Sequence, residues 1–137
     1  MIRATRPEDT PLLVELARAT GVFKPLEIQA LREVLDDYHA TNRAPGHCCV
    51  TAEEAGRITG FAYYAPSSMA DRAWYLYWIA VRSDLQARGL GGRLLRQVED
   101  EAERSRLWSL AIAAYPPYAE YQERTARRIP VFIAERA

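Results

Sequence analysis

The feature that most constrains the fold of this chain is an apolar run followed by a polar turn, a glycine-rich segment and a helical pattern. The run, Trp74 to Val81, lacks polar alternation, which indicates a strand that is covered on both faces. Beyond the glycines, apolar residues recur at helical spacing while charged residues occupy the opposite face; the apolar set is Leu94, Leu95, Val98 and Ala102. This stretch predicts a central strand that leads through a tight junction into an amphipathic helix.

Three glycines, Gly89, Gly91 and Gly92, lie at the junction. Glycine has no Cβ, so the backbone can approach a ligand closely, and the first turn of a helix has amide N–H groups without intrahelical partners. These donors and the positive end of the helix dipole favour a phosphate or pyrophosphate. The segment therefore predicts an anion-binding loop. Taken alone, such a turn is equally well interpreted as a tight connection that binds nothing.

Two nucleotide-binding motifs do not fit this segment. A P-loop requires Gly-Lys-Ser or Gly-Lys-Thr, whereas Gly92 is followed by Arg93 and Leu94. A dinucleotide fingerprint requires a third glycine where Leu94 stands, and an acidic residue about 20 positions further on. Both nucleotide motifs are therefore excluded.

The segment does resemble the pyrophosphate loop of the GCN5-related N-acetyltransferases. The pattern of that loop is Gln or Arg, two free positions, Gly, one free position, and then Gly or Ala. Gln86, Gly89 and Gly91 match it, and the preceding residues Leu76 to Val81 are similar to the family's central strand. The resemblance extends from Met1 to about Ala114. It implies an α/β fold of layered α+β type, in which helices flank a mixed, mostly antiparallel sheet.

The resemblance also implies acetyl-CoA as co-substrate. Its pyrophosphate would bind the amides of the loop, and its pantetheine arm would pair like an extra strand with backbone groups near the end of the apolar run. The residues implied for cofactor binding are Ile79, Ala80, Val81, Gln86, Ala87, Arg88, Gly89, Leu90, Gly91 and Gly92. Acetyl transfer to an amine would then depend mostly on positioning and on oriented donors that stabilise the oxyanion.

Length and composition indicate a single domain over residues 1–137. Of the 137 residues, 49% are hydrophobic and 26% are charged, and the formal net charge is zero. Such a chain has no general attraction for nucleic acid or for an anionic membrane. The adjacent cysteines, Cys48 and Cys49, have no metal-binding spacing and are not expected to form a disulfide with each other. Without a signal region or a membrane-spanning run, a cytoplasmic protein is expected.

Several further elements are predicted before the apolar run. They are a strand over Ile2–Thr5, a helix from about Glu8 to Thr20, a helix that begins at Pro25 and ends before Asn42, and strands over His47–Glu53 and Arg57–Ala65. The turn Glu54-Ala55-Gly56 predicts that the last two strands form a hairpin. In the family, the second helix lies over the acceptor side, so the resemblance implies that Val22 to Thr41 help to select the substrate.

The run Arg106 to Ala114 follows the amphipathic helix and predicts a strand parallel to the central one, because strand, right-handed crossover helix and parallel strand form a common unit. The family fold ends with a further helix and two strands, for which residues 115–137 are too few. Here only a helix over Pro117–Arg128 and a strand over Val131–Ala134 are expected. This part of the chain is therefore atypical or abbreviated.

The shortened region affects the expected chemistry. In many family members a tyrosine on the last helix protonates the departing thiolate of coenzyme A. Relatives that begin this region similarly carry Phe-Tyr where this chain has Arg124 and Thr125. Tyr118 and Tyr121 are substitutes by position only. They are the candidate catalytic residues.

A general base cannot be named from the sequence. The apolar run contains no acidic residue, and Glu53 and Glu54 lie at the predicted hairpin tip, where solvated charges are expected. His39 and His47 are isolated residues for which no catalytic role is expected.

Two functional hypotheses follow. The first is an N-acetyltransferase that transfers an acetyl group from acetyl-CoA to a primary amine of a small molecule or protein. The second is a catalytically weak or inactive relative that keeps the acyl-CoA-binding loop or only the scaffold, or a product shortened by a deletion or frameshift after Ala114. The acceptor stays open, and so does a homodimer in which a second copy completes the sheet.

Overall fold

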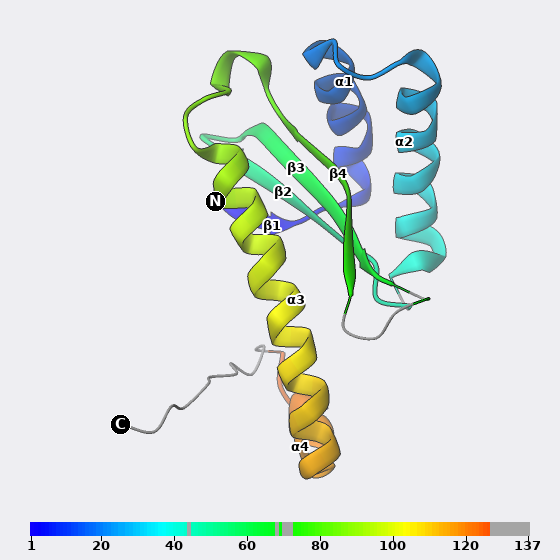
Figure 1. Ribbon diagram of the computed structural model, residues 1–137, viewed down its shortest axis with the longest axis vertical. Coiled ribbons are helices and arrows are strands. Elements are labelled where there is room, and N and C mark those ends of the chain that lie inside the picture. Colours follow the sequence, from blue (N-terminus) through cyan, green and yellow to red (C-terminus); the bar gives the residue numbers. More distant parts are fainter. Residues whose placement is uncertain (44, 68, 70–72, 127–137) are drawn as a thin grey trace. The chain divides into compact units, whose positions relative to one another are not determined.

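A computed structural model describes residues 1–43, 45–67, 69 and 73–126 (Figure 1). The chain divides into two compact units, Met1–Val98 and Glu99–Ala137. Helix α3 (Leu90–Ala114) begins in the first unit and ends in the second. The single domain predicted from length stays a prediction. Within the described residues, every helix is too short or too polar to cross a membrane.

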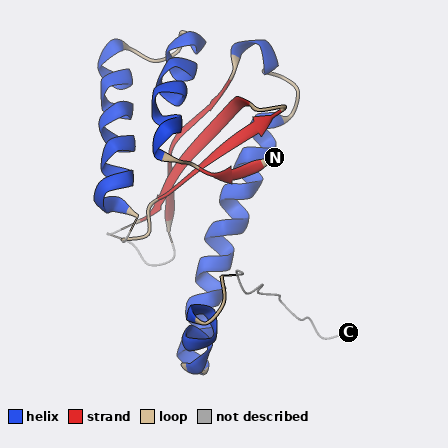
Figure 2. Ribbon diagram, turned by 180° about the vertical axis from the view of Figure 1, so that it is seen from behind, coloured by secondary structure: helices blue, strands red, loops and turns tan. Residues whose placement is uncertain are grey.

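The first unit is built on a four-stranded antiparallel sheet in the order β1-β2-β3-β4 (Figure 2). The strands are β1 (Ile2–Ala4), β2 (Cys48–Glu54), β3 (Arg57–Pro66) and β4 (Trp74–Val81). β2 and β3 form the predicted hairpin. At its turn, Ala55 and Gly56 both have positive φ, 50° and 73°, which a tight hairpin turn requires.

Two helices lie side by side on one face of this sheet (Figure 1). They are α1 (Thr10–Thr20), which a short 3-10 helix (Pro7–Asp9) precedes, and α2 (Pro25–Asp37), which a π-helical turn (Tyr38–Asn42) follows. Each has a proline in its first turn, where the missing N–H costs nothing. Gly21, with φ of 73°, ends α1 as a left-handed cap. The two predicted helices are confirmed.

The sheet is buried on both faces because its side chains alternate between two cores. Toward α1 and α2, Phe61 and Tyr63 of β3 pack with residues such as Leu13, Leu31 and Leu35. Toward the first turns of α3, the other core consists of Val50, Ala52, Ala62, Tyr64, Leu90, Leu94 and Val98. Of the apolar stripe predicted for the helix after the glycines, Leu94 and Val98 therefore face the sheet, whereas Leu95 is exposed. Both cysteines are free thiols, and burial raises the pKa of Cys49 to about 12.

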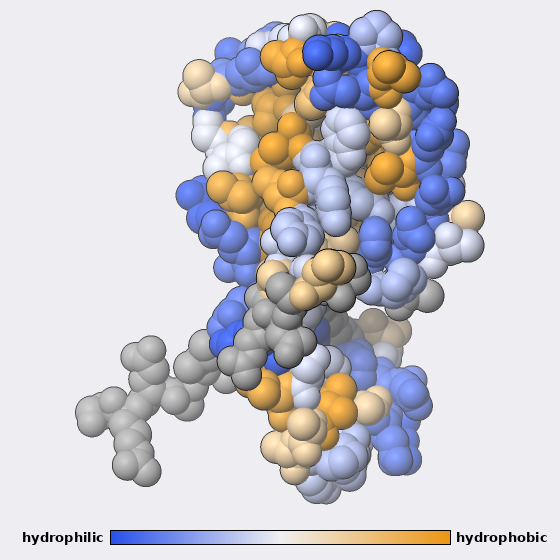
Figure 3. All heavy atoms as spheres, turned by 45° about the vertical axis from the view of Figure 1, so that its right-hand side comes forward, coloured by the Kyte–Doolittle hydropathy of each residue, from blue (hydrophilic) through white to orange (hydrophobic). Residues whose placement is uncertain are grey.

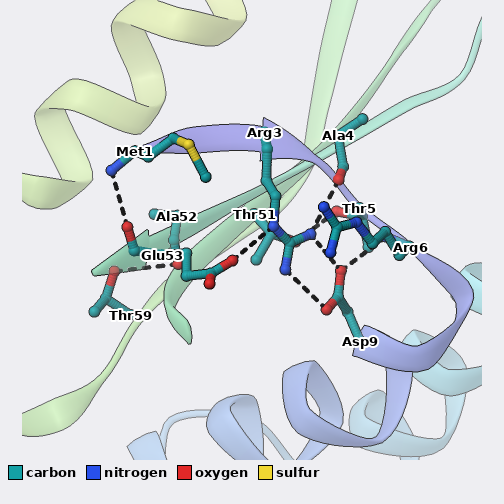
Figure 4. A network of polar contacts seen from close by, with 10 residues as sticks. All are labelled: Met1, Arg3, Ala4, Thr5, Arg6, Asp9, Thr51, Ala52, Glu53 and Thr59. Carbon is teal, nitrogen blue, oxygen red and sulfur yellow. Dashed lines mark hydrogen bonds and ion pairs between the residues drawn. The ribbon is translucent and has the colours of Figure 1, made fainter. Parts of the chain in front are cut away.

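A polar network ties β1 to the start of α1 and to the hairpin (Figure 4). The Arg3 guanidinium donates two hydrogen bonds to the Asp9 carboxylate, at 2.7 and 3.0 Å, and one to Glu53 at 2.7 Å. The backbone N–H of Arg6 also donates to Asp9. The hydrogen bonds from Arg3, above all, lower the pKa of Asp9 despite its burial. Glu53 is thus a partly buried ion-pair partner, and the expectation of a solvated charge was wrong.

The position predicted for the apolar run was wrong in one respect. Residues 74–81 do form a strand, but among the described residues β4 pairs only with β3 and so lies at an edge of the sheet. Its Tyr75, Leu76 and Tyr77 are exposed. An apolar run shows that a strand contacts apolar neighbours, but it does not show whether a second strand lies beyond it.

The parallel strand predicted over Arg106–Ala114 was also wrong, because this segment continues α3. No glycine or proline interrupts residues 93–115, and alanine, the strongest helix former, recurs at Ala111, Ala113 and Ala114. The helix ends just before Pro116, which cannot continue it. All strand pairs described are therefore antiparallel, and the mixed sheet expected from the resemblance is not formed in this part of the chain.

The second unit contains the rest of α3 and a short helix, α4 (Pro117–Glu123). The helix predicted from Pro117 thus starts as expected but ends at Glu123 rather than at Arg128. Four aromatic side chains pack against one another here: Trp108, Tyr115, Tyr118 and Tyr121. The strand predicted over Val131–Ala134 lies outside the described residues.

Candidate functional site

A cavity of about 420 Å³ lies in the first unit, beside the outer edge of β4. It is lined by the end of α1 and the following loop, by β4, by the segment after β4, and by the first turns of α3; these residues are Thr20, Val22, Phe23, Leu76, Ile79, Ala80, Val81, Leu85, Gln86, Ala87, Gly91, Gly92 and Leu95. Each of these is uncharged. Hydrophobic residues gather in a band on the face of the molecule that Figure 3 shows.

The segment after β4, residues 82–86, is short and is held by hydrogen bonds. The backbone N–H of Arg82 donates to the carbonyl of Thr59 on β3 at 2.9 Å, and residues Ser83–Leu85 form one 3-10 turn. The side-chain amide of Gln86 then donates to the carbonyl of Val81 at 3.2 Å. Gln86 therefore holds the loop back against the end of the strand.

The glycine-rich loop reverses direction through two left-handed residues, Ala87 with φ of 64° and Gly89 with φ of 80°. α3 begins at the next residue, Leu90, whose buried side chain packs with Leu94 and Val98. The first intrahelical bond runs from the N–H of Arg93 to the carbonyl of Gly89. The N–H groups of residues 90–92 precede this bond and so have no partner within the helix.

The cavity brings together most of the residues implied for cofactor binding. Ile79, Ala80 and Val81 line it from the strand, and Gln86, Ala87, Gly91 and Gly92 line it from the loop and helix. The other three do not line it: Arg88 and Gly89 are exposed, and Leu90 is buried in the core. The side chain of Leu90 is therefore a core residue, and only its backbone can serve an anion.

The structure also identifies cavity residues that were not among those implied for cofactor binding, although Val22 and Phe23 belong to the range that the resemblance implied for substrate selection. Thr20, Val22 and Phe23 come from the end of α1 and the loop after it, and Leu76, Leu85 and Leu95 complete the apolar wall. The only signal for the first group is the helix stop at Gly21, which says where α1 ends but not what lies opposite. Their contribution follows from the packing of α1 on the sheet.

Two glycines next to this site have opposite surroundings. A Cβ on Gly91 would meet only Val81 Cγ2, at 3.9 Å, so the space beside this backbone is open. A Cβ on Gly60 of β3 would lie 2.9 Å from the carbonyl oxygen of Ala80 and 3.0 Å from Leu94 Cδ1. Gly60 is therefore required for the close packing of α3 on the sheet, whereas Gly91 leaves room for a ligand.

β4 contains a bulge in the middle of its length. Tyr63 of β3 lies opposite Trp78, whereas Tyr64 lies opposite Leu76, so Tyr77 has no partner residue on β3. A bulge of this kind bends the strand and re-aims its side chains. Trp78 packs on Phe23 with the ring centroids 5.4 Å apart, and Tyr77 packs on Tyr63 at 6.2 Å. Two successive side chains of β4 thus turn to the face that α1 and α2 cover.

The surroundings of the loop are positively charged. Three exposed arginines, Arg88, Arg93 and Arg96, lie in the loop and on the first turns of α3, where the helix dipole is also positive. Arg93 makes a long ion pair of 3.5 Å with Glu54, an exposed contact that contributes little energy. An anion at the start of α3 would therefore meet oriented N–H donors and nearby cations.

The candidate catalytic residues, Tyr118 and Tyr121, belong to the second unit, where they lie in the aromatic cluster with Trp108 and Tyr115. Both are exposed. The cavity belongs to the first unit, so their role stays a prediction.

Neither histidine is among the residues that line the cavity. His47 Nδ1 forms a hydrogen bond of 2.6 Å with the Tyr63 hydroxyl. Both ring nitrogens of His39 are buried without a hydrogen-bond partner among the described residues. Burial and the nearby Arg43 lower the pKa of His39, so its neutral form is favoured.

The chain is similar to known proteins in sequence and in fold. The model of the acetyltransferase (GNAT) family matches residues 12–119. A GNAT-family protein from Desulfovibrio desulfuricans is 32% identical, with a TM-score of 0.69 over 75% of this chain and 65% of that one. A search among curated proteins found no match.

Two more distant structures share the fold. A GNAT-family acetyltransferase from Brucella melitensis in complex with acetyl-CoA is 23% identical, with a TM-score of 0.60 over 75% of this chain and 68% of that one. The PaiA N-acetyltransferase from Thermoplasma acidophilum in complex with coenzyme A is 18% identical, with a TM-score of 0.61 over 75% and 71%. The present chain thus spans about two thirds of the length of these proteins. With the family model matched over most of its residues, the chain belongs to the GNAT acetyltransferase family.

Proposed function

We propose that the chain binds acetyl-CoA in the cavity beside β4 and transfers the acetyl group to a primary amine of a small molecule or protein. The observation that carries this proposal is the junction itself. One cavity is lined both by the outer edge of β4 and by the first turn of α3, which are the two surfaces that a pantetheine arm and a pyrophosphate require. The ligands of the Brucella melitensis and Thermoplasma acidophilum structures support it.

The pyrophosphate would bind at the start of α3. The N–H groups of residues 90–92 point out of the helix end, and the left-handed Gly89 opens the turn in front of them. The open space at Gly91 allows phosphate oxygens to reach the backbone. The arginines around the loop would add long-range attraction for the phosphates.

The pantetheine arm would lie along the outer edge of β4. In the described part of the chain this edge is not paired with another strand, so its backbone groups can pair with the amides of an extended ligand. Ile79 and Val81 provide this edge within the cavity, and Leu76, Val22 and Phe23 provide apolar contacts around it.

When acetyl-CoA is bound, its thioester supplies an activated acetyl group. The contribution of the chain is to hold that group and the amine at reacting distance in a site with apolar walls. The bulge at Tyr77 interrupts the ladder with β3, which frees backbone groups next to the cavity. An N–H group freed in this way would stabilise the negative charge that develops on the thioester oxygen.

The second hypothesis, an acyl-CoA-binding domain with weak or no catalysis, rests on a separate observation. Among the described residues, no carboxylate or histidine lines the cavity, and the two candidate tyrosines lie in the other unit. Binding needs only the loop and the strand, whereas protonation of the departing thiolate needs a placed donor. A homodimer and a cytoplasmic location stay predictions under both hypotheses.

Two measurements test these hypotheses. Calorimetry with coenzyme A should give binding, and 3′-phosphoadenosine 5′-diphosphate, which lacks the pantetheine, should bind less tightly. A thiol-release assay over a panel of primary amines then separates an enzyme from a binding domain. No heat and no thermal shift at millimolar coenzyme A would exclude both hypotheses, because a ligand that binds the folded state must stabilise it.

A further inference from the structure

Two exposed tyrosines lie on the edge strand beside the cavity. The side chains of Tyr75 and Tyr77 are 49% and 55% exposed, although large aromatic side chains usually avoid such exposure. Their rings lie 5.9 Å apart and are tilted by 57° to each other. They therefore form an angled aromatic surface on the face of the sheet that α1 and α2 cover.

This surface is held in place from below. The ring of Tyr77 packs on Tyr63 at 6.2 Å, and Tyr63 packs edge-on against Tyr38 at 5.8 Å. Both supporting rings are buried, and the Tyr63 hydroxyl is held by His47. Burial raises the pKa of Tyr63 to about 12, so this support stays uncharged at neutral pH. An anchored aromatic ring loses little conformational entropy when a ligand packs on it.

The tyrosines do not line the cavity themselves, but Leu76, which lies between them in the chain, does. The bulge turns both Tyr77 and Trp78 to the same face, and Trp78 packs on Phe23, which lines the cavity. A thioester held along β4 would therefore lie next to the tyrosines, and an acceptor amine would have to approach it across them. This step rests on the proposed function.

We propose that Tyr75 and Tyr77 are specificity-determining residues that select an acceptor whose amine is carried by an aromatic body. Tilted rings offer edge-to-face packing to a further ring. The described cavity wall is uncharged and apolar, which penalises a charged ammonium more than a neutral amine. An α-amino group titrates near 7.7–8.0 and a lysine amine near 10.4, so at pH 7.5 the α-amine is neutral about 200- to 300-fold more often. The acceptor class is therefore the α-amine of a peptide or amide whose first residue is aromatic.

A panel of four acceptors separates the two parts of this proposal. Phenylalanine amide has an aromatic body and an α-amine, and glycinamide has the α-amine alone. Phenethylamine has the aromatic body with a strongly basic amine, and 1,4-diaminobutane has neither feature. We expect kcat/KM from thiol release to be highest for phenylalanine amide. Binding of phenylalanine amide to the protein saturated with coenzyme A is measured by calorimetry, which requires no turnover.

The variants Tyr75→Ala and Tyr77→Ala should each lower the affinity and kcat/KM for phenylalanine amide about tenfold more than those for glycinamide. Tyr77→Phe should retain the preference, since the ring is kept. The matched control is Leu12→Ala, which removes an exposed apolar side chain of the same unit outside the cavity lining. Affinity for coenzyme A should stay unchanged in all four variants.

Three results would overturn the proposal. If both alanine variants keep wild-type affinity and kcat/KM for phenylalanine amide while coenzyme A binds, the tyrosines select nothing and the proposed function is unaffected. If the alanine variants instead lower the affinity and kcat/KM for 1,4-diaminobutane, the rings bind a cation by cation–π contact. A wild-type chain that binds no coenzyme A would overturn the proposed function and this inference with it.

Discussion

The two compact units of this chain place their apolar residues in opposite ways. The first unit buries them in two cores, one on each face of its sheet, with Leu13 and Phe61 in one and Tyr64 and Leu94 in the other. In the second unit none of the described residues is fully buried, and Leu110 is 50% exposed. Tertiary packing therefore stabilises the first unit, whereas local helix propensity has the larger share in the second.

The most direct test of this difference is to truncate one leucine in each unit to alanine. Leu94→Ala should cost about 2–5 kcal/mol of unfolding free energy, because Leu94 is fully buried between α3 and the sheet. Leu110→Ala should change it by less than about 0.5 kcal/mol. Urea unfolding measures both. Equal losses would mean that the second unit has a core in solution, contrary to the comparison.

The polar network of the first unit should be nearly as sensitive. Asp9→Asn should cost about 2–3 kcal/mol, because it removes the charged partner that accepts two hydrogen bonds from the partly buried Arg3 guanidinium. The control, Glu15→Gln, disrupts an exposed ion pair with Arg18 and should cost less than about 1 kcal/mol. Both values come from urea unfolding at pH 7. If the two substitutions cost the same, the network in Figure 4 contributes no more than a surface pair.

The same network predicts how stability depends on pH. Arg3 lowers the pKa of folded Asp9 below that of the unfolded chain, near 3.9. The stabilisation is therefore complete above about pH 4 and is lost as the pH falls through the lower, folded pKa. Thermal unfolding between pH 2 and 7 should show a steeper acid loss for wild type than for Asp9→Asn. If the unfolding temperatures of wild type and Asp9→Asn fall equally with pH, Asp9 does not cause the acid loss of stability.

The binding role of the first unit is tested at Gly91. Gly91→Glu should lower the affinity for coenzyme A at least 100-fold, or about 2.7 kcal/mol of binding free energy, because a carboxylate would enter the space next to the helix N-terminus. The fold should survive, since a Cβ there would meet only Val81 Cγ2, at an ordinary contact distance of 3.9 Å. Gly91→Ala is the control and should bind within about fivefold of wild type. Calorimetry and circular dichroism separate binding from folding. Wild-type affinity in Gly91→Glu would place the anion site elsewhere.

The smallest effect is expected in the second unit. Tyr118→Phe and Tyr121→Phe should leave the affinity for coenzyme A within twofold of wild type, because both residues lie outside the unit that contains the cavity. Thiol release should be slow in wild type and in both variants, since a placed proton donor typically contributes about 10²- to 10⁴-fold. Robust wild-type turnover that is lost in one variant would assign that tyrosine a catalytic role. The second unit would then contribute to catalysis.

Local patterns accounted for much of the fold. Prolines at helix starts, Gly21 at a helix end and the Ala55-Gly56 turn each act within a few residues, and α1, α2 and the hairpin formed as predicted. The run Arg106–Ala114 was misjudged because a short apolar segment suits a strand or a helix equally by periodicity. With no glycine or proline between Gly92 and Pro116, the helix continues through it.

The residues of the candidate site divide in the same way. The loop motif predicted Gln86, Gly89 and Gly91 because its backbone requirements are local, and Gln86 and Gly91 do line the cavity. The cavity wall from Thr20 to Phe23 and the bulge at Tyr77 depend on contacts between elements far apart in the chain. No local sequence pattern therefore predicted them.

By itself, the sequence determined that a strand, a glycine-rich turn and a helix follow one another, since each depends on side-chain periodicity and on the backbone freedom of glycine. Only the tertiary structure decided that β4 lies at an edge of the described sheet, and that Gly60 lets α3 pack close against it. The physical reason is that pairing partners and close approaches are long-range properties. A residue's own neighbours in the chain do not specify which distant backbone will lie beside it.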